Sequence, residues 1–154
     1  MAEFSRSIAL VIGSNNYQDG LPALETARHD AKRLAEVLQE QHGYEVILLL
    51  DKDATQESIS ELLNETLPDR LGADDRMLFY FAGHGVALDS DGGPNGYLLP
   101  QDARRSDETS FIHMPALSDA LCALDCRHML VILDSCFGGA FRWSSSREAM
   151  VLPD

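Results

Sequence analysis

Four short apolar runs constrain the fold of this 154-residue chain more than any other feature of its sequence. They span residues 8–12, 45–50, 77–82 and 129–133. Each is rich in branched or aromatic side chains and is apolar at nearly every position, as in strands of a parallel sheet that is covered on both faces. The runs therefore predict four buried parallel strands.

Three segments between these runs have helical periodicity. Residues 26–41 place Ala27, Ala31 and Leu38 on one face. A second helix is predicted to begin after Thr55, a good N-cap residue, and a third near Pro115, which suits a first helical turn. Because strands and helices alternate, we expect an α/β fold in one domain, with a mostly parallel, doubly wound sheet and helices on both faces.

The connection 83–113 interrupts this alternation, since it is about thirty residues long. Turn-forming residues occupy 89–96 between two apolar stretches, 86–88 and 97–99, so a small hairpin is predicted there. The aspartates of this turn do not form an EF-hand, because glycine and proline occupy two of the ligand positions that such a loop requires.

Composition excludes several classes of function. The net charge of −13, from 25 acidic and 12 basic side chains, would repel a phosphate backbone, so no nucleic-acid partner is expected. The sequence contains no run of about 18 apolar residues, the length that a membrane-spanning helix needs. Residues 1–7 lack the basic and apolar regions of a signal peptide. With an odd number of cysteines, three, these features predict a cytoplasmic protein with reduced thiols.

Two of the cysteines, Cys122 and Cys126, lie four residues apart in a predicted helical region. No second pair of ligands lies nearby, so we expect thiols in the core rather than a zinc site. The sequence predicts no metal site.

Two motifs with reactive side chains follow the third and fourth predicted strands. Residues 82–85 read AGHG and residues 134–136 read DSC. Ligands bind at the carboxyl ends of the strands in open α/β sheets. If the two strands are neighbours, His84 and Cys136 share one crevice.

The residue types fit nucleophilic catalysis. A thiol becomes a strong nucleophile when a histidine takes its proton, and the same histidine can return that proton to the leaving amine. Adjacent glycines leave the peptide N–H groups of Gly85 and Cys136 free to stabilise an oxyanion. Either motif alone would more often be structural, but together they predict a cysteine hydrolase with His84 as general base and Cys136 as nucleophile.

These motifs resemble those of caspases, metacaspases and their bacterial relatives, including the orthocaspase type. That family has histidine in a Ser/Ala-Gly-His-Gly context and, roughly 50 residues later, cysteine in Gln-Ala-Cys or Asp-Ser-Cys; here Cys136 follows His84 by 52 residues. Residues 9–17 resemble the family's first strand and its Gly-x-Asn-x-Tyr turn, and residues 97–103 resemble a Tyr-Leu-Leu-Pro-x-Asp-Ala stretch of bacterial members.

The resemblance implies a three-layer caspase fold with a six-stranded, mostly parallel sheet divided into a large and a small portion. Four strands and both catalytic residues belong to the large portion, to which residues 1–154 would correspond. The chain ends 18 residues after Cys136, so we expect the small portion as a second chain or a downstream segment, covering the edge of the fourth strand. No cofactor is expected; the resemblance allows calcium activation, but the sequence shows no site for it.

The resemblance also bears on specificity. Caspases that cut after aspartate carry a pocket arginine six residues before an Asp-Ala-x-x-Leu helix start, a position that Leu24 occupies here. Metacaspases instead show Leu-x-Gly-Cys-x-x-Asp; Leu24 and Asp30 match this pattern, whereas Thr26 and Ala27 depart from it.

A second pocket carboxylate of metacaspases corresponds to Asp134, and Ala82 replaces a serine common in that pocket. Two carboxylates favour a forked guanidinium, so cleavage after Arg or Lys is predicted. Asp30 could instead be a carboxylate that interacts with the positive end of its helix dipole, and Asp134 could orient a loop. An Asp-specific peptidase and a catalytically silent assembly module with the caspase fold remain the alternatives.

The polar stretch 142–147 suggests processing. It lies just beyond the cysteine motif, where proteolytic nicking is expected. With basic specificity, Arg142 or Arg147 would be a self-cleavage site.

Overall fold

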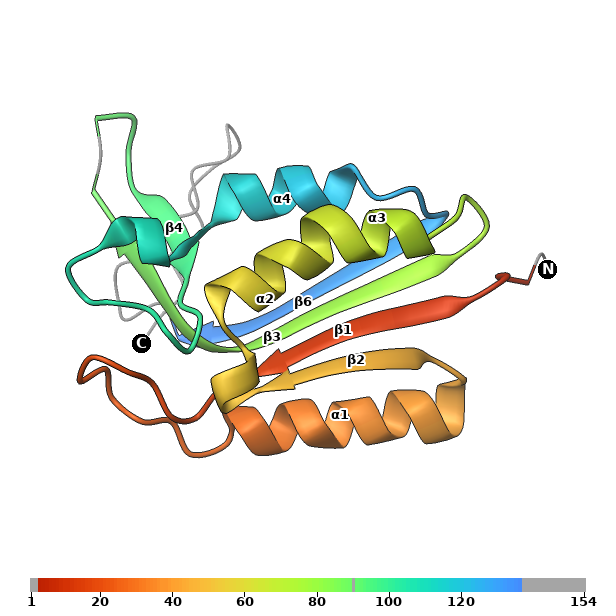
Figure 1. Ribbon diagram of the computed structural model, residues 1–154, viewed down its shortest axis with the longest axis horizontal. Helices are drawn as coiled ribbons and strands as arrows, with labels where there is room; N and C mark the ends of the chain where they lie inside the picture. Colours follow the sequence, from red (N-terminus) through yellow and green to blue (C-terminus); the bar gives the residue numbers. More distant parts are fainter. Residues whose placement is uncertain (1–2, 90, 137–154) are drawn as a thin grey trace.

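The structure, a computed structural model, describes residues 3–89 and 91–136 of the chain. Its central feature is a parallel sheet in the order β2-β1-β3-β6, shown in Figure 1. These strands are β1 (Ser7–Gly13), β2 (Glu45–Leu50), β3 (Arg76–Leu88) and β6 (His128–Cys136). All four strands predicted from the apolar runs are confirmed.

β1 lies at the centre of the core. It pairs with β2 on one side and β3 on the other, and its residues 8–12 have no exposed surface. Successive residues of β1 alternate between the two apolar clusters that flank the sheet. Burial on both faces explains why this run lacks the polar alternation of a half-exposed strand.

Helices cover both faces of the sheet, as predicted (Figure 1). Helix α1 (Ala27–His42) packs on one face through Ala31 and Leu38. The other face is covered by α4 (Met114–Cys122) and by a bent helical segment that comprises α2 (Gln56–Glu61), the π-helical η2 (Leu62–Thr66) and α3 (Leu67–Arg70). Thr55 caps α2 by accepting a hydrogen bond from the Ser58 N–H, so the predicted helix start is confirmed.

A small antiparallel extension increases the number of strands. β3 continues past its predicted end to Leu88 and pairs with β4 (Asn95–Leu98), which pairs with β5 (Ile112–His113). The predicted hairpin is thus confirmed, but the expectation of four strands is corrected to six within the described residues. The extra length arises because the small residues around His84 stay extended and bond to Leu99, whose N–H donates to the His84 carbonyl (3.0 Å). Short 3₁₀ turns, η1 (Asp51–Asp53) and η3 (Glu108–Ser110), complete the described elements.

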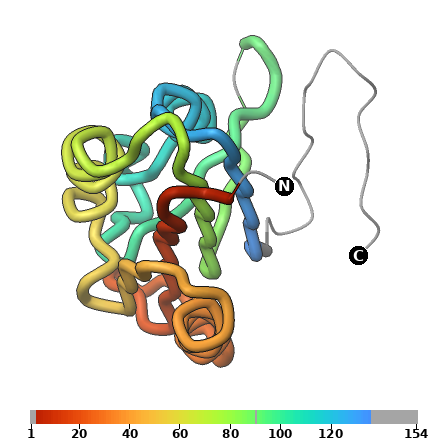
Figure 2. Tube along the Cα trace, turned by 90° about the vertical axis from the view of Figure 1, so that its right-hand side faces the viewer, coloured from red at the N-terminus to blue at the C-terminus, as the bar shows by residue number. Residues whose placement is uncertain are grey.

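β6 forms one side of the sheet. Within the described residues it pairs with β3 alone, and Figure 2 shows it at the outer side of the coloured trace. Two of its apolar side chains are exposed, Leu130 by 55% and Val131 by 41%. The sheet edge that was expected to need a covering partner is therefore unpaired in this part of the chain.

The expectation that Cys122 and Cys126 lie in the core was wrong for Cys122, whereas Cys126 packs against the edge of the core. Cys122 is the last residue of α4 and is exposed, and Cys126 is partly buried in the following loop. Both line a groove of about 710 Å³ between α4 and β6. The lining of this groove is largely apolar; in the described part of the chain Val131 is exposed there, whereas Leu117 and Leu121 are buried at its base.

No helix in the part of the chain that the structure describes is long and apolar enough to cross a membrane. Among the same residues, no group of three or more His, Cys, Asp or Glu side chains could hold a metal ion.

Candidate active site

The two motifs meet at the carboxyl ends of adjacent strands. β3 and β6 run parallel, and in their register His84 is the Cα partner of Cys136. The condition that their strands are neighbours is therefore met. Only the backbone of Cys136 is described, as the last residue of β6.

The imidazole of His84 is held by a main-chain carbonyl. Its Nε2 lies 2.7 Å from the oxygen of Pro22. Because a carbonyl oxygen can only accept a hydrogen bond, Nε2 carries the proton, and the neutral ring keeps Nδ1 as its basic nitrogen. This contact selects the tautomer of a histidine that accepts a proton through Nδ1.

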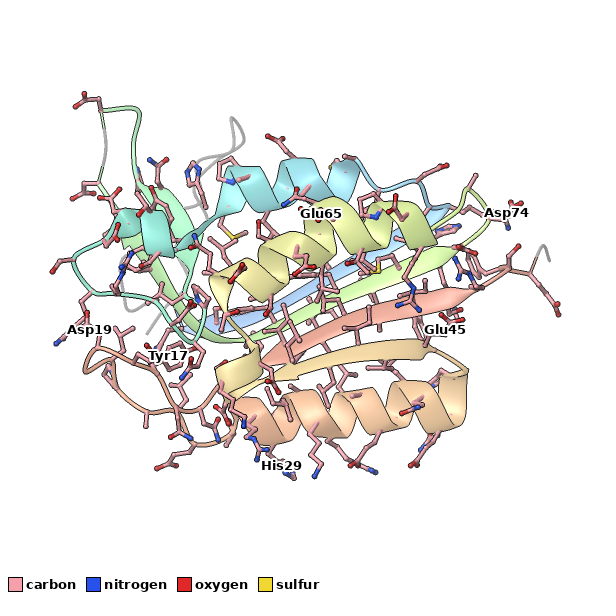
Figure 3. The ribbon with its side chains drawn as sticks, in the orientation of Figure 1. Tyr17, Asp19, His29, Glu45, Glu65 and Asp74 are labelled. Carbon is pink, nitrogen blue, oxygen red and sulfur yellow. The ribbon has the colours of Figure 1, made fainter. Side chains whose placement is uncertain are left out.

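Tyr17 makes a second set of contacts with His84. Its hydroxyl accepts a hydrogen bond from the His84 backbone N–H at 2.8 Å, and the two rings lie 4.6 Å apart at a tilt of 50°. Burial raises the pKa of Tyr17 to about 12; the nearby Asp51 acts in the same direction and the His84 bond opposes them. The hydroxyl is therefore neutral at physiological pH. Figure 3 shows Tyr17 at the end of the sheet toward which β1 points, opposite to Glu45 and Asp74.

Tyr17 and Pro22 belong to one loop, residues 14–26, that joins β1 to α1. Asp51 fixes its start, because Oδ1 of Asp51 accepts the backbone N–H groups of Asn15 (2.8 Å) and Asn16 (3.0 Å). Oδ2 of Asp51 pairs with Nε of Arg28 at 2.9 Å. The loop that contacts His84 is thus anchored to the end of β2.

The same loop supplies the cap of α1. Thr26 at the N-cap position makes no capping bond with its side chain. Instead Oδ1 of Asn15 accepts the backbone N–H of Arg28 at 2.9 Å. This cap fixes the first turn of α1, which contains Asp30.

Asp30 and Asp134 both lie near the hydroxyl of Tyr80. The pKa of Tyr80 is raised to about 12. Burial is the largest cause, and the negative charges of Asp134 and Asp30 and a hydrogen bond with Asp134 raise it further. Among the described residues, neither carboxylate forms an ion pair. Two carboxylates without a cation beside one phenol make a local site that attracts positive charge.

The remaining predicted residues are placed as follows. Ala82 is the Cα partner of Asp134 and is buried in the apolar cluster between the sheet and α1, and Gly85 pairs with Leu98 of β4. Arg142 and Arg147 lie outside the described residues.

Sequence reasoning did not identify Tyr17, Pro22 or Tyr80 as parts of this site. A sequence pattern could have pointed to Tyr17, because the turn of residues 13–17 follows a strand at the edge of the sheet where ligands bind. Pro22 acts through its main-chain oxygen, which no side-chain pattern reveals. Tyr80 lies in an apolar run and reads as a core residue.

Comparison with known proteins bears on the family and the fold. The family model of the caspase domain matches residues 6–151. The fold is also similar to the crystal structure of protein GSU0716 from Geobacter sulfurreducens, with a TM-score of 0.72 and 24% sequence identity. That match covers 88% of this chain and 52% of the other, so the chain spans about half the length of the Geobacter protein. No curated protein matches the chain.

The family match extends over nearly the whole chain and includes both motifs that meet at the ends of β3 and β6. The chain therefore belongs to the caspase domain family, a family of cysteine peptidases.

Proposed function

We propose that the protein is a cysteine endopeptidase in which His84 is the general base and Cys136 the nucleophile. One observation carries the proposal: the two residues are Cα partners at the carboxyl ends of adjacent parallel strands. The hydrogen bond from Nε2 to Pro22 supports it, because it leaves Nδ1 of His84 able to accept a proton.

The reaction follows from these roles. Nδ1 of His84 takes the thiol proton of Cys136, and the thiolate attacks the carbonyl carbon of the scissile peptide bond. When the tetrahedral intermediate collapses, the C–N bond breaks and His84 gives its proton to the leaving amine. A thioester remains on Cys136. His84 then deprotonates water, which attacks the thioester carbonyl; the C–S bond breaks, the carboxylic acid is released, and His84 returns the proton to the sulfur of Cys136.

The backbone N–H groups of Gly85 and Cys136 are the proposed oxyanion donors. In the β3–β4 ladder the N–H of Leu99 donates to His84, so hydrogen-bonded positions fall at His84 and at alternate residues of β3. Gly85 lies between them, and its N–H therefore faces the other edge of β3, where β6 lies. That direction supports its role beside Cys136.

The proposed substrates have Arg or Lys before the scissile bond. Asp30 and Asp134 support this, because both act on the Tyr80 hydroxyl and neither has a cation of its own among the described residues. A guanidinium entering this site would neutralise both carboxylates. Leu24, at the position of the caspase arginine, also disfavours an acidic substrate.

We further propose that a small portion, as a second chain or a downstream segment, completes the enzyme. The edge of β6, which is unpaired within residues 3–89 and 91–136, and the apolar groove between α4 and β6 support this partner. Self-cleavage at Arg142 or Arg147 and calcium activation remain proposals from the sequence and its resemblance. The odd number of cysteines supports the cytoplasm as the working compartment.

Active-site labelling of the full-length protein tests the proposed function. A peptidyl chloromethyl ketone ending in arginine should alkylate Cys136, as peptide mass mapping would show. The same peptide ending in aspartate should react much more slowly, and the Cys136→Ala variant should not be labelled. Equal labelling of all three cysteines by both probes would contradict the proposal.

A further inference from the structure

We infer that Tyr17 is a positioning residue that holds His84 in its working orientation. The inference rests on the proposed function, because it assigns a role in preparing the proposed general base. The contacts of Tyr17 are with the main-chain N–H and the ring of His84, so its effect would be exerted through His84. Three observations carry it: the hydrogen bond from the main chain of His84, the contact between the rings, and the space that Gly83 leaves.

The hydrogen bond replaces one that the sheet would otherwise make. The N–H of Leu99 donates to the His84 carbonyl, and in a regular antiparallel pair the N–H of His84 would donate back to Leu99. It donates instead to the Tyr17 hydroxyl, at 2.8 Å. Tyr17 therefore fixes the main chain of β3 at the residue where β3 passes from its parallel to its antiparallel partner.

The ring contact restricts the side chain. The Tyr17 ring packs against the imidazole with 4.6 Å between the centroids, and Pro22 accepts the bond from Nε2. The 14–26 loop thus holds one histidine through its main chain, the face of its ring and one ring nitrogen. Rotation of the imidazole would break the last two contacts.

Gly83 gives the Tyr17 hydroxyl its place. A Cβ atom at residue 83 would come within 2.4 Å of the Tyr17 hydroxyl and 3.1 Å of the Phe81 ring. Only glycine lets the hydroxyl approach the main chain this closely. The glycine before the catalytic histidine therefore accommodates Tyr17.

The first test compares Tyr17→Phe with Tyr97→Phe in the full-length protein. Tyr97 is a matched control, because it is also buried against a histidine ring, that of His113 at 4.9 Å. Tyr17→Phe should lower kcat on an arginyl peptide about 10- to 100-fold, since a small misplacement of a catalytic group costs up to about 100-fold. KM should change less than about twofold, because no substrate contact is lost, and Tyr97→Phe should behave as the wild type.

If Tyr17 had a purely structural role, its loss would not alter the tautomer of the His84 imidazole, which ¹⁵N NMR measures directly. In the wild type, the side-chain signals of His84 should report one tautomer, with the proton on Nε2. In Tyr17→Phe they should report a mixture of tautomers, and the acidic limb of the pH–kcat profile should move. Tyr17→Leu, which also removes the ring, should show both effects more strongly.

A double-mutant cycle tests the role of Gly83. Gly83→Ala should lower kcat in the wild type, because its methyl group displaces the Tyr17 hydroxyl. In the Tyr17→Phe background that hydroxyl is absent, so the same substitution should cost several-fold less. Equal costs in both backgrounds would contradict the geometry.

The two proposals fail in different ways. If the wild type does not cleave peptides, the proposed peptidase function falls, and the NMR comparison still decides whether Tyr17 holds His84. If the wild type is active but Tyr17→Phe matches Tyr97→Phe in kcat, pH profile and His84 signals, the role of Tyr17 is overturned and the proposed function stands.

Discussion

At the residue scale, Asp30 and Asp134 are the residues that we propose determine which substrate the enzyme accepts. Asp30→Asn or Asp134→Asn should each weaken transition-state binding of an arginyl substrate by about 2–5 kcal/mol, the range for removing one partner of a buried charge pair. The kcat/KM ratio for arginyl peptides measures this. Glu40→Gln is the matched control, since Glu40 is an exposed carboxylate near the other end of α1. A substrate profile dominated by aspartate would refute the pocket.

Tyr80 gives the protein a pH dependence of its own. Its folded-state pKa of about 12 exceeds the ordinary value of 10.0. Below pH 10 both states keep the proton, so stability is unaffected; above it the unfolded chain ionises first, and stability falls until the pH passes 12. Tyr80→Phe should therefore lose less stability than the wild type between pH 10 and 12, as urea unfolding would measure. Parallel losses would disprove the effect of burial.

At the element scale, the 14–26 loop depends on Asp51. This residue has a left-handed backbone conformation (φ 46°), which Asp and Asn tolerate better than Ala. Asp51→Ala should lower the free energy of unfolding by about 1–3 kcal/mol, because it removes the acceptor of two backbone N–H groups. Asp51→Asn keeps one acceptor oxygen and should cost less. Chemical denaturation measures both; equal stability of Asp51→Ala and wild type would exclude the anchor.

The same elements show what the sequence could predict. The four buried strands, the Thr55 cap and the hairpin followed from local patterns, because burial on both faces and turn chemistry leave clear signals. The extension of β3 through His84 did not, since it depends on hydrogen bonds to Leu99 and to Tyr17, a residue 67 positions earlier.

The candidate site also contains residues that the sequence could predict and residues that it could not. His84 and Cys136 could be predicted to lie side by side, because each stands beside small residues at the end of a strand; the parallel register does bring their backbones together. Pro22 could not be identified, because its contact depends on the path of a loop. That path is set by Asp51, which bonds to residues 35 and 36 positions away. Long-range main-chain contacts of this kind leave no local pattern.

At the scale of the whole molecule, the groove between α4 and β6 should bind the proposed small portion. Val131→Lys places a charge in this apolar groove, and because Val131 is 41% exposed, the stability of the described part should change by only about 0.5 kcal/mol. Activity of the full-length protein should fall, because the charge opposes burial of the groove. Gln39→Lys, on an exposed site of α1, is the control.

Cys122 reports whether the groove is covered. It is exposed in the described part of the chain and lines the groove, so an alkylating reagent measures its accessibility. In the full-length wild type, Cys122 should react slowly, and Val131→Lys should increase the rate. Equal, rapid labelling of Cys122 in both proteins would show that nothing covers this face.

The central claim is that His84 and Cys136 act together as the catalytic pair. The most direct test is kcat/KM for an arginyl peptide in the full-length wild type, His84→Ala, Cys136→Ala and the double variant. The account predicts that each single variant loses activity by at least about 1,000-fold, and that the double variant loses little more, because residues acting as one unit are not additive. Unchanged melting temperatures would show that the fold is intact. Near wild-type hydrolysis by either single variant would contradict the claim.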